Sequence, residues 1–241
     1  MTALADDEIQ RVLAVTAHPD DVDFGAAGTI AGWTAAGIEV AYCIVTYGDA
    51  GGFDPAVART EIPKIREAEQ RAAAAAVGVQ DVTFLGYPDG RVEVSFDLRR
   101  DITRQIRRVR PQRVVAHSPL RNWQRIAPSH PDHLAAGEAA LCAVYPDARN
   151  PYAHPELLRD EGLDEWKVAE MWLSGGPAPD HYVDITETFD RKLAALHEHR
   201  SQTAHMEDLE GMLRTWVSAN AMAASLPEGR LAEAFQVIST A

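Results

Sequence analysis

The chain has 241 residues, of which 46 % are hydrophobic and 24 % charged, which is typical of a soluble globular domain and unlike a disordered chain. The net charge of −13 argues against nucleic acid or anionic lipid as a partner, because both attract basic proteins. Since no apolar run could span a bilayer and the first residues do not resemble a signal peptide, we expect a cytoplasmic protein without membrane insertion.

From residue 11 onward, short runs rich in β-branched residues alternate with longer helical segments. The predicted strands are 11–17, 38–46, 81–86 and 113–117, and the predicted helices between them are 24–37, 60–78 and 95–110. This alternation is typical of a mostly parallel sheet with helices on both faces. We therefore predict a Rossmann-like α/β fold in a single domain, residues 1–241.

The pattern changes after the fourth predicted strand. Residues 118–132 form a loop longer than most connections, which makes it a candidate functional segment. A helix over 133–145, a strand over 167–175 and a short edge strand over 181–186 are predicted next. From about residue 187 onward, the chain is predicted to be helical.

Two segments rich in histidine and aspartate follow predicted strands. "HPDD" (18–21) follows the first strand, and "SHPDH" (129–133) ends the loop after the fourth. In an open doubly wound sheet, ligands bind beyond the carboxyl ends of the strands, where successive connections leave in opposite directions. With a strand order 3-2-1-4-5, the two segments would face each other at that point.

Residues of these segments can form a metal site. Two histidines and one carboxylate leave coordination positions open, as in a catalytic zinc site, and we expect His18, Asp21 and His133 to be the ligands. Asp20 lies beside this set and could accept a proton from water at the metal. The cofactor expected from this donor set is Zn²⁺.

The second segment also offers an acid. His130 could stabilise a developing oxyanion and protonate an amine leaving group, with Asp132 as the carboxylate that orients its ring. The spacing leaves open the opposite assignment, in which His130 binds the metal and His133 is the acid.

Five segments in order along the chain resemble the zinc-dependent de-N-acetylases of the LmbE-like, or PIG-L, family: "AHPDDVDFGAAGTIAGW", "TYGDAGG", "REAEQRAAAAAVGV", "FLGYPDG" and "SHPDHLAAGEAA". A later segment, "KLAALHEHRSQ" (192–202), resembles another block of that family. The resemblance implies an LmbE-like fold, one zinc ion, and hydrolysis of an N-acyl bond. It implies an N-acetyl group on an amino sugar, such as an N-acetylglucosamine-containing small molecule, as the substrate.

The same resemblance assigns roles to individual residues. It implies zinc ligands at His18, Asp21 and His133 and the general base at Asp20. It implies an acid at His130 that stabilises the oxyanion and is tuned by Asp132. It also implies substrate contacts at Arg66 and Asp89. The common family form is HPDDE, whereas here Val22 and Asp23 follow the second aspartate. No role for Asp23 follows from the resemblance.

The same residues are compatible with three other functions. One is an amidase that acts on a thiol-sugar S-conjugate with the same centre, and another is a non-haem iron redox enzyme, because two histidines and a carboxylate also suit Fe(II). The third is a sugar- or nucleotide-binding module without catalysis. Assembly as a homo-oligomer, a trimer or a hexamer, is expected only by analogy with the family.

Overall fold

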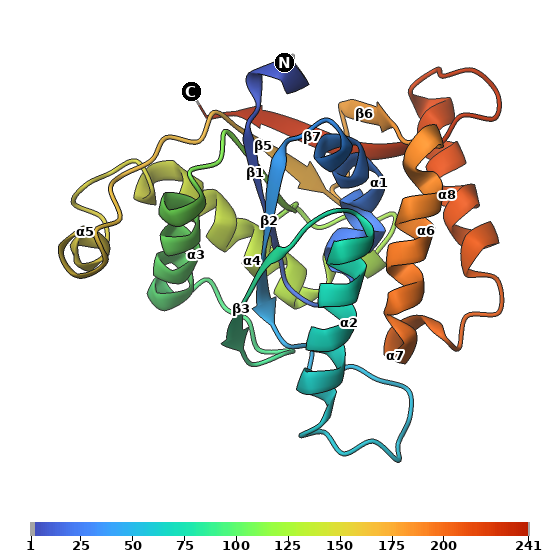
Figure 1. Cartoon of the computed structure of the whole chain (residues 1–241), viewed down its shortest axis with the longest axis horizontal. Coiled ribbons are helices and arrows are strands. Elements are labelled where there is room, and N and C mark those ends of the chain that lie inside the picture. The colour runs from blue at the N-terminus through green and yellow to red at the C-terminus, as the bar shows by residue number, and fades with distance from the viewer. Residues whose placement is uncertain (1–2, 241) are drawn as a thin grey trace.

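The computed structural model describes residues 3–240 and contains a seven-stranded sheet in the order β3-β2-β1-β4-β5-β7-β6 (Figure 1). The strands are β1 (Arg11–Thr16), β2 (Glu39–Thr46), β3 (Asp81–Tyr87), β4 (Arg113–His117), β5 (Glu170–Ser174), β6 (His181–Asp184) and β7 (Ala232–Ser239). Strands β1 to β5 pair in parallel, whereas β7 is antiparallel to both β5 and β6. The predicted order 3-2-1-4-5 is confirmed.

Helices cover both faces of the sheet (Figure 1). Their bounds are α1 (Asp21–Ala35), α2 (Ile62–Ala76), α3 (Phe96–Val109), α4 (Pro131–Cys142), α5 (Pro155–Glu161), α6 (Phe189–Glu198), α7 (Arg200–Thr203) and α8 (Leu209–Ala223). Helices α1, α2 and α6 lie on one face, and α3 and α4 lie on the other. The predicted Rossmann-like α/β fold is therefore confirmed.

Each face of the sheet has its own apolar core. Successive side chains of a strand point to opposite faces, so Val12 packs toward α1 and α2 while Leu13 packs toward α3 and α4. Both side chains are fully buried, as expected for a strand in the middle of a parallel sheet. Because both faces are covered, the carboxyl ends of β1 and β4 are where side chains can reach a ligand.

The prediction of a helical chain from about residue 187 onward is wrong at its end. Residues Ala232–Ser239 form β7, which pairs with β5 and adds Phe235 and Val237 to the core. The ring of Phe235 lies 5.2 Å from that of Trp172 on β5, measured between centroids. Partly buried and buried residues alternate through most of β7, which is the period of a strand packed on one face.

Two predicted helices begin earlier than expected. Helix α1 starts at Asp21 instead of residue 24, and α4 starts at Pro131 instead of residue 133. Both differences draw the histidine and aspartate segments into the first turns of helices, where backbone N–H groups are free of intrahelical partners.

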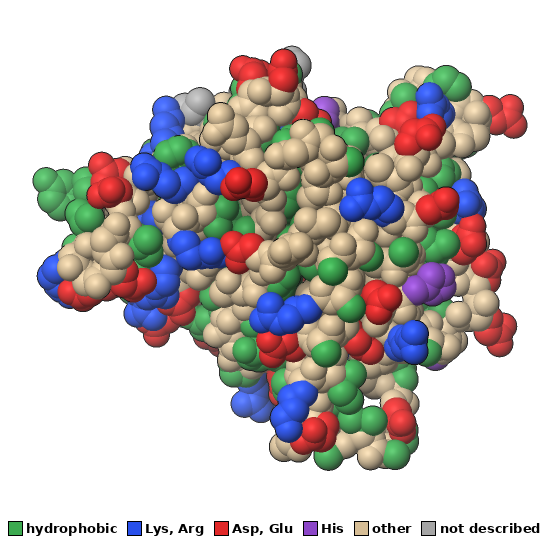
Figure 2. Space-filling view, viewed as in Figure 1, with side chains coloured by type: hydrophobic (Ala, Val, Ile, Leu, Met, Phe, Trp, Pro, Cys, Tyr) green, Lys and Arg blue, Asp and Glu red, His purple; other side chains and the backbone are tan. Residues whose placement is uncertain are grey.

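The exterior matches the acidic composition. On the face shown in Figure 2, Lys and Arg side chains lie among Asp and Glu side chains instead of gathering into one continuous patch. Within residues 3–240, no helix is both long and apolar enough to cross a membrane.

Candidate metal centre

The turn between β1 and α1 holds the first histidine and aspartate segment in a strained conformation. Asp20, the residue before α1, has φ 89° and ψ −27°, in the left-handed region that non-glycine residues avoid at a cost of about 1–3 kcal/mol. Its carbonyl oxygen accepts hydrogen bonds from the amides of Asp23 (2.9 Å) and Phe24 (3.0 Å), which start the helix. Because of this bend, the carboxylates of Asp20 and Asp21 contact different neighbouring residues.

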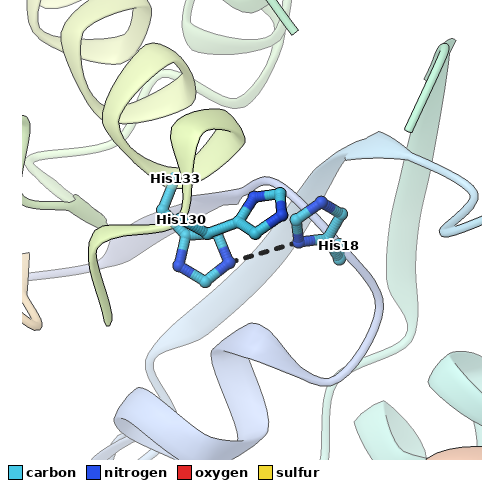
Figure 3. A group of neighbouring side chains, drawn as sticks. All are labelled: His18, His130 and His133. Carbon is cyan, nitrogen blue, oxygen red and sulfur yellow. Dashed lines mark hydrogen bonds between the residues drawn. The ribbon is translucent and has the colours of Figure 1, made fainter. Parts of the chain in front are cut away.

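Two histidine nitrogens and both oxygens of one carboxylate converge from the two segments. The Nδ1 atom of His18 lies 3.2 Å from Nε2 of His133 and 3.4 Å from a carboxylate oxygen of Asp21. The other Asp21 oxygen lies 3.1 Å from the same His133 nitrogen. Zinc bonds of about 2.0–2.1 Å place tetrahedral ligands about 3.3 Å apart, so these three residues fit one metal ion. Figure 3 shows His18 and His133 joined by this contact, with His130 beside them.

A further histidine, His117 at the end of β4, lies against this set. Its Nε2 atom is 3.2 Å from Asp21, and its ring stacks on that of His133 with centroids 4.2 Å apart. The structure thus also offers Asp21, His117 and His133, or His18, His130 and His133, as compact donor groups. No role for His117 follows from the sequence segments alone, although its place at the carboxyl end of a central strand is a usable signal.

The histidines and carboxylates of the centre shift one another's pKa values. Burial alone would lower the pKa of His18, but contacts with Asp21, Asp132 and Asp89 raise it to about 12. Burial would raise the pKa of Asp21, yet the nearby histidines hold it well below its usual range. Because histidines and carboxylates face one another here, they share protons, and a bound cation can replace these protons.

The far nitrogen of His18 is held by two carboxylates. Its Nε2 atom lies 3.0 Å from Asp89 and 3.2 Å from Asp132. Asp132 is fixed in turn by the amides of Gly90 (2.7 Å) and Val92 (3.2 Å). Metal-binding histidines commonly donate their second N–H to a carboxylate in this way, which orients the ring and increases its basicity.

These contacts differ from the sequence-based expectations for Asp132 and Asp89. The carboxylate of Asp132 contacts His18, and the contact of this residue with His130 comes from its backbone amide, 3.2 Å from His130 Nδ1. Helix α4 begins at Pro131, so the His130 ring caps the helix and receives that amide. Asp89 reaches the same nitrogen of His18 and accepts a hydrogen bond from the amide of Ala50 (2.9 Å).

Arg66 is a buried support of the turn. Its guanidinium donates to the backbone oxygens of Pro19 (2.6 Å) and Gly48 (3.0 Å) and lies 3.3 Å from the Asp20 carboxylate. The side chain is only 4 % exposed. Gly48 has φ 65°, and a side chain there would collide with this guanidinium, so glycine permits the approach. Both terminal nitrogens of Arg66 thus bond the protein, whereas its buried Nε has no hydrogen-bond partner among the residues that the structure describes.

Asp20 and His130, the two remaining candidate residues, differ in exposure and in the direction of their pKa shifts. Burial raises the pKa of Asp20 to about 7, although Arg66 acts in the opposite direction. Burial and the charge of His18 lower the pKa of His130, whose ring is the exposed member of the cluster. The Nδ1 atom of His130 accepts a hydrogen bond, which leaves the proton of its neutral ring on Nε2.

A cavity of about 500 Å³ adjoins the centre beside Asp21, His117 and His133. Its other walls include the apolar side chains of Phe24 and Trp216. This volume lies within the usual range of small-molecule sites. Six of the eight residues expected to form a site follow β1 and β4, and Arg66 on α2 and Asp89 after β3 contact them. The cavity adjoins two of the eight, Asp21 and His133.

Comparisons with known proteins show which family the chain resembles. The family profile described as PIG-L, GlcNAc-PI de-N-acetylase, matches residues 13–144. Diacetylchitobiose deacetylase of Thermococcus kodakarensis is 30 % identical over 81 % of this chain and 71 % of its own length. A probable N-acetyl-alpha-D-glucosaminyl L-malate deacetylase 2 of Bacillus cereus is 35 % identical over 85 % of this chain and 90 % of its own.

A solved structure extends the likeness to nearly the whole fold. N,N'-diacetylchitobiose deacetylase from Pyrococcus horikoshii superposes with a TM-score of 0.88 at 30 % identity, covering 97 % of this chain and 85 % of its own. The match includes the C-terminal strands and helices that lie outside the family profile.

Proposed function

Because this chain belongs to the PIG-L family of GlcNAc-PI de-N-acetylases, we propose that it is a metal-dependent enzyme that removes the acetyl group from an N-acetylglucosamine-containing small molecule. The observation that carries the proposal is the convergence of His18, Asp21 and His133 within 3.1–3.4 Å of one another. The named relatives act on diacetylchitobiose and on N-acetylglucosaminyl malate, which share an N-acetylglucosamine unit.

The ion proposed for this set is Zn²⁺, held by His18, Asp21 and His133. The nitrogen and oxygen donors and their spacing suit zinc, and the carboxylates on the far side of His18 supply the usual outer support. When bound, the ion would polarise the amide carbonyl and make water a better nucleophile.

Asp20 is proposed as the general base. As water attacks the amide carbonyl carbon, the Asp20 carboxylate takes a proton from that water. Its position next to the ligand Asp21 in the chain, with Arg66 3.3 Å from its carboxylate, holds it beside the reacting atoms while its own backbone is fixed by the turn. General bases placed in this way contribute about 10²–10⁴-fold to rate.

His130 is proposed as the hydrogen-bond donor to the carbonyl oxygen as that oxygen gains charge. Its Nε2–H is free because Nδ1 is engaged by the amide of Asp132. Collapse of the tetrahedral species breaks the C–N bond, and the proton that Asp20 took from the water passes to the leaving nitrogen, which restores the Asp20 carboxylate. The products are a free amine and acetate. Asp132 is proposed to act through His18. The substrate contacts expected at Asp89 and Arg66 stay predictions, beside the contacts of Asp89 with His18 and of Arg66 with the turn.

The amidase alternative is not favoured, because the named relatives are deacetylases of N-acetylglucosamine-containing compounds. The substrate screen described next would also recognise a non-haem iron redox enzyme or a binding module without catalysis. Assembly into a trimer or hexamer remains a prediction.

A substrate screen tests the proposal. The purified protein is assayed for acetate release from N-acetylglucosamine, N,N'-diacetylchitobiose, N-acetylglucosaminyl malate and N-acetylglucosaminyl inositol, with and without a chelator. We expect acetate from at least one of them, abolished by the chelator and restored by zinc. Oxygen uptake with iron, or tight binding without product, would replace the proposal with one of the alternatives.

A further inference from the structure

Asp23, for which no role follows from the family resemblance, is a buried carboxylate three positions after the proposed base. It lies on α1 and is fully buried. One of its oxygens accepts hydrogen bonds from Gln70 Nε2 and from His199 Nε2, each at 2.8 Å. A buried carboxylate is costly, and the other oxygen of Asp23 has no hydrogen-bond partner within residues 3–240, so this arrangement needs a reason beyond packing.

The contact with Asp23 fixes how the Gln70 amide is turned. Gln70, on α2, is also fully buried. Its nitrogen must face Asp23, because a carboxylate only accepts hydrogen bonds, and its oxygen therefore faces the other way. That oxygen accepts the backbone N–H of Asp20 at 2.8 Å. A Gln70 amide turned by half a rotation would meet this N–H with another donor.

The bond from Gln70 falls on the strained residue. Asp20 has φ 89°, and a backbone in this region is kept only where its surroundings hold it. Gln70 holds its N–H, and the first turn of α1 holds its carbonyl oxygen. The direction of the Asp20 carboxylate depends on this backbone conformation.

The last member of the chain of contacts comes from a distant part of the sequence. His199 lies between α6 and α7, outside the residues 13–144 that match the family profile. Its side chain is fully buried, and its carbonyl oxygen accepts the Thr203 hydroxyl at 2.9 Å. Lys192, on α6, adds a second tie by donating to the Asp23 carbonyl oxygen at 2.9 Å.

We propose that His199, Asp23 and Gln70 are positioning residues that hold Asp20 in the backbone conformation from which it acts as base. His199 fixes Asp23, Asp23 fixes the direction of the Gln70 amide, and Gln70 fixes the Asp20 N–H. The inference rests on the proposed function for its catalytic meaning, but the contacts stand without it. It gives the C-terminal helices a direct part in the site.

Two substitutions of His199 test the proposal. H199L removes the donor to Asp23, whereas H199Q keeps an N–H donor near the same place. We expect H199L to lower kcat at least tenfold, with KM within twofold of wild type and the metal content unchanged, because Asp20 acts on water and holds neither substrate nor metal. H199Q should recover most of the lost kcat.

A matched pair of carboxylate variants separates positioning from general stability. Glu170 is also buried and accepts a hydrogen bond from Arg113 (2.6 Å) at the amino end of β5, the opposite edge of the sheet. D23N should lower kcat, whereas E170Q should lower the melting temperature and leave kcat of the folded protein unchanged. Equal effects of D23N and E170Q on kcat would overturn the proposal.

Amide hydrogen exchange gives a readout that needs no activity. In wild type the Asp20 amide should be protected by Gln70, and in H199L it should exchange at least tenfold faster, with H199Q close to wild type. Unchanged exchange and unchanged kcat in H199L would overturn the proposal, as would a loss of kcat that follows loss of metal. If wild type releases no acetate from any substrate, the proposed function fails, and exchange at Asp20 still decides the positioning role.

Discussion

The Nδ1 atom of His18 lies 3.2 Å from Nε2 of His133, although the two residues are 115 positions apart in the sequence. Two imidazole nitrogens at this distance, with an Asp21 oxygen 3.1 Å from the second, form a converging donor set. Each histidine follows a different central strand of the sheet, so the topology creates the contact. The following predictions test what this contact is for.

Replacing the proposed base should stop catalysis without loss of metal. D20N keeps the shape of the side chain but removes its ability to take a proton. We expect kcat to fall by about 10²–10⁴-fold, the range measured for general bases, with zinc content unchanged. Acetate release and metal analysis on the same preparation measure both. A D20N protein with more than a tenth of wild-type kcat would show that the base lies elsewhere.

The carboxylate behind His18 should set metal affinity. D132N removes an acceptor that lies 3.2 Å from His18 Nε2, and loss of such outer support lowers metal affinity by about 10–100-fold. Competition with a chelator of known affinity measures the change. The control is D97N, since Asp97 is an exposed residue paired with Arg100 on α3. If D132N binds zinc as tightly as D97N, Asp132 does not support the metal ligand.

Removal of Arg66 should shift the pH dependence in a defined direction. The Arg66 guanidinium lowers the pKa of Asp20, which burial raises to about 7. R66M should therefore raise this pKa, so that Asp20 becomes protonated, and inactive as a base, at a higher pH. We expect the acidic limb of the kcat/KM profile to move to higher pH, with a larger loss at pH 6.5 than at pH 8.5. An unchanged limb, or one moved to lower pH, would contradict the assignment.

Two helical glycines should respond oppositely to alanine. Gly137, on α4, packs so closely on the backbone at His117 that a methyl group would collide with its carbonyl oxygen. G137A should cost about 1–3 kcal/mol in the free energy of unfolding, the usual cost of overpacking. Gly32, on α1, has no atom within 4 Å of an added methyl group, so G32A should stabilise by about 0.5–1 kcal/mol. Urea unfolding of both variants measures the difference, and a stabilising G137A would contradict the packing described.

The parts of the fold that the sequence predicted share one property. Strands β1, β2 and β4 are apolar on both faces, and Gly or Pro mark the ends of the helices between them, so local pattern and final structure agree. Strand β7 was missed because apolar and polar residue types do not alternate regularly in AEAFQVIS, although their burial in the structure does. The strand is defined by pairing with β5, a contact that local sequence does not contain. Its place as a strand is set by tertiary structure.

The site shows the same division. The residues proposed to hold the metal ion come from two short segments, which the order of the parallel strands brings together. The partner of the Asp132 carboxylate could not be predicted in this way. Whether this carboxylate contacts His130 or His18 depends on the turn at Gly90, whose amide donates to the carboxylate at 2.7 Å. The roles of Gln70 and His199 also depend on how α2 and α6 pack beside α1, which no single segment encodes.

The central claim is that one metal ion, held by His18, Asp21 and His133, makes this chain an N-deacetylase. The most direct test is the rate of acetate release from the best N-acetylglucosamine-containing substrate as zinc is added stepwise to chelator-treated protein. We expect a rate that rises in proportion to zinc and levels off at about one ion per chain, with no such rise in H133A. Acetate release that is independent of added zinc, or absent at every zinc concentration, would contradict it.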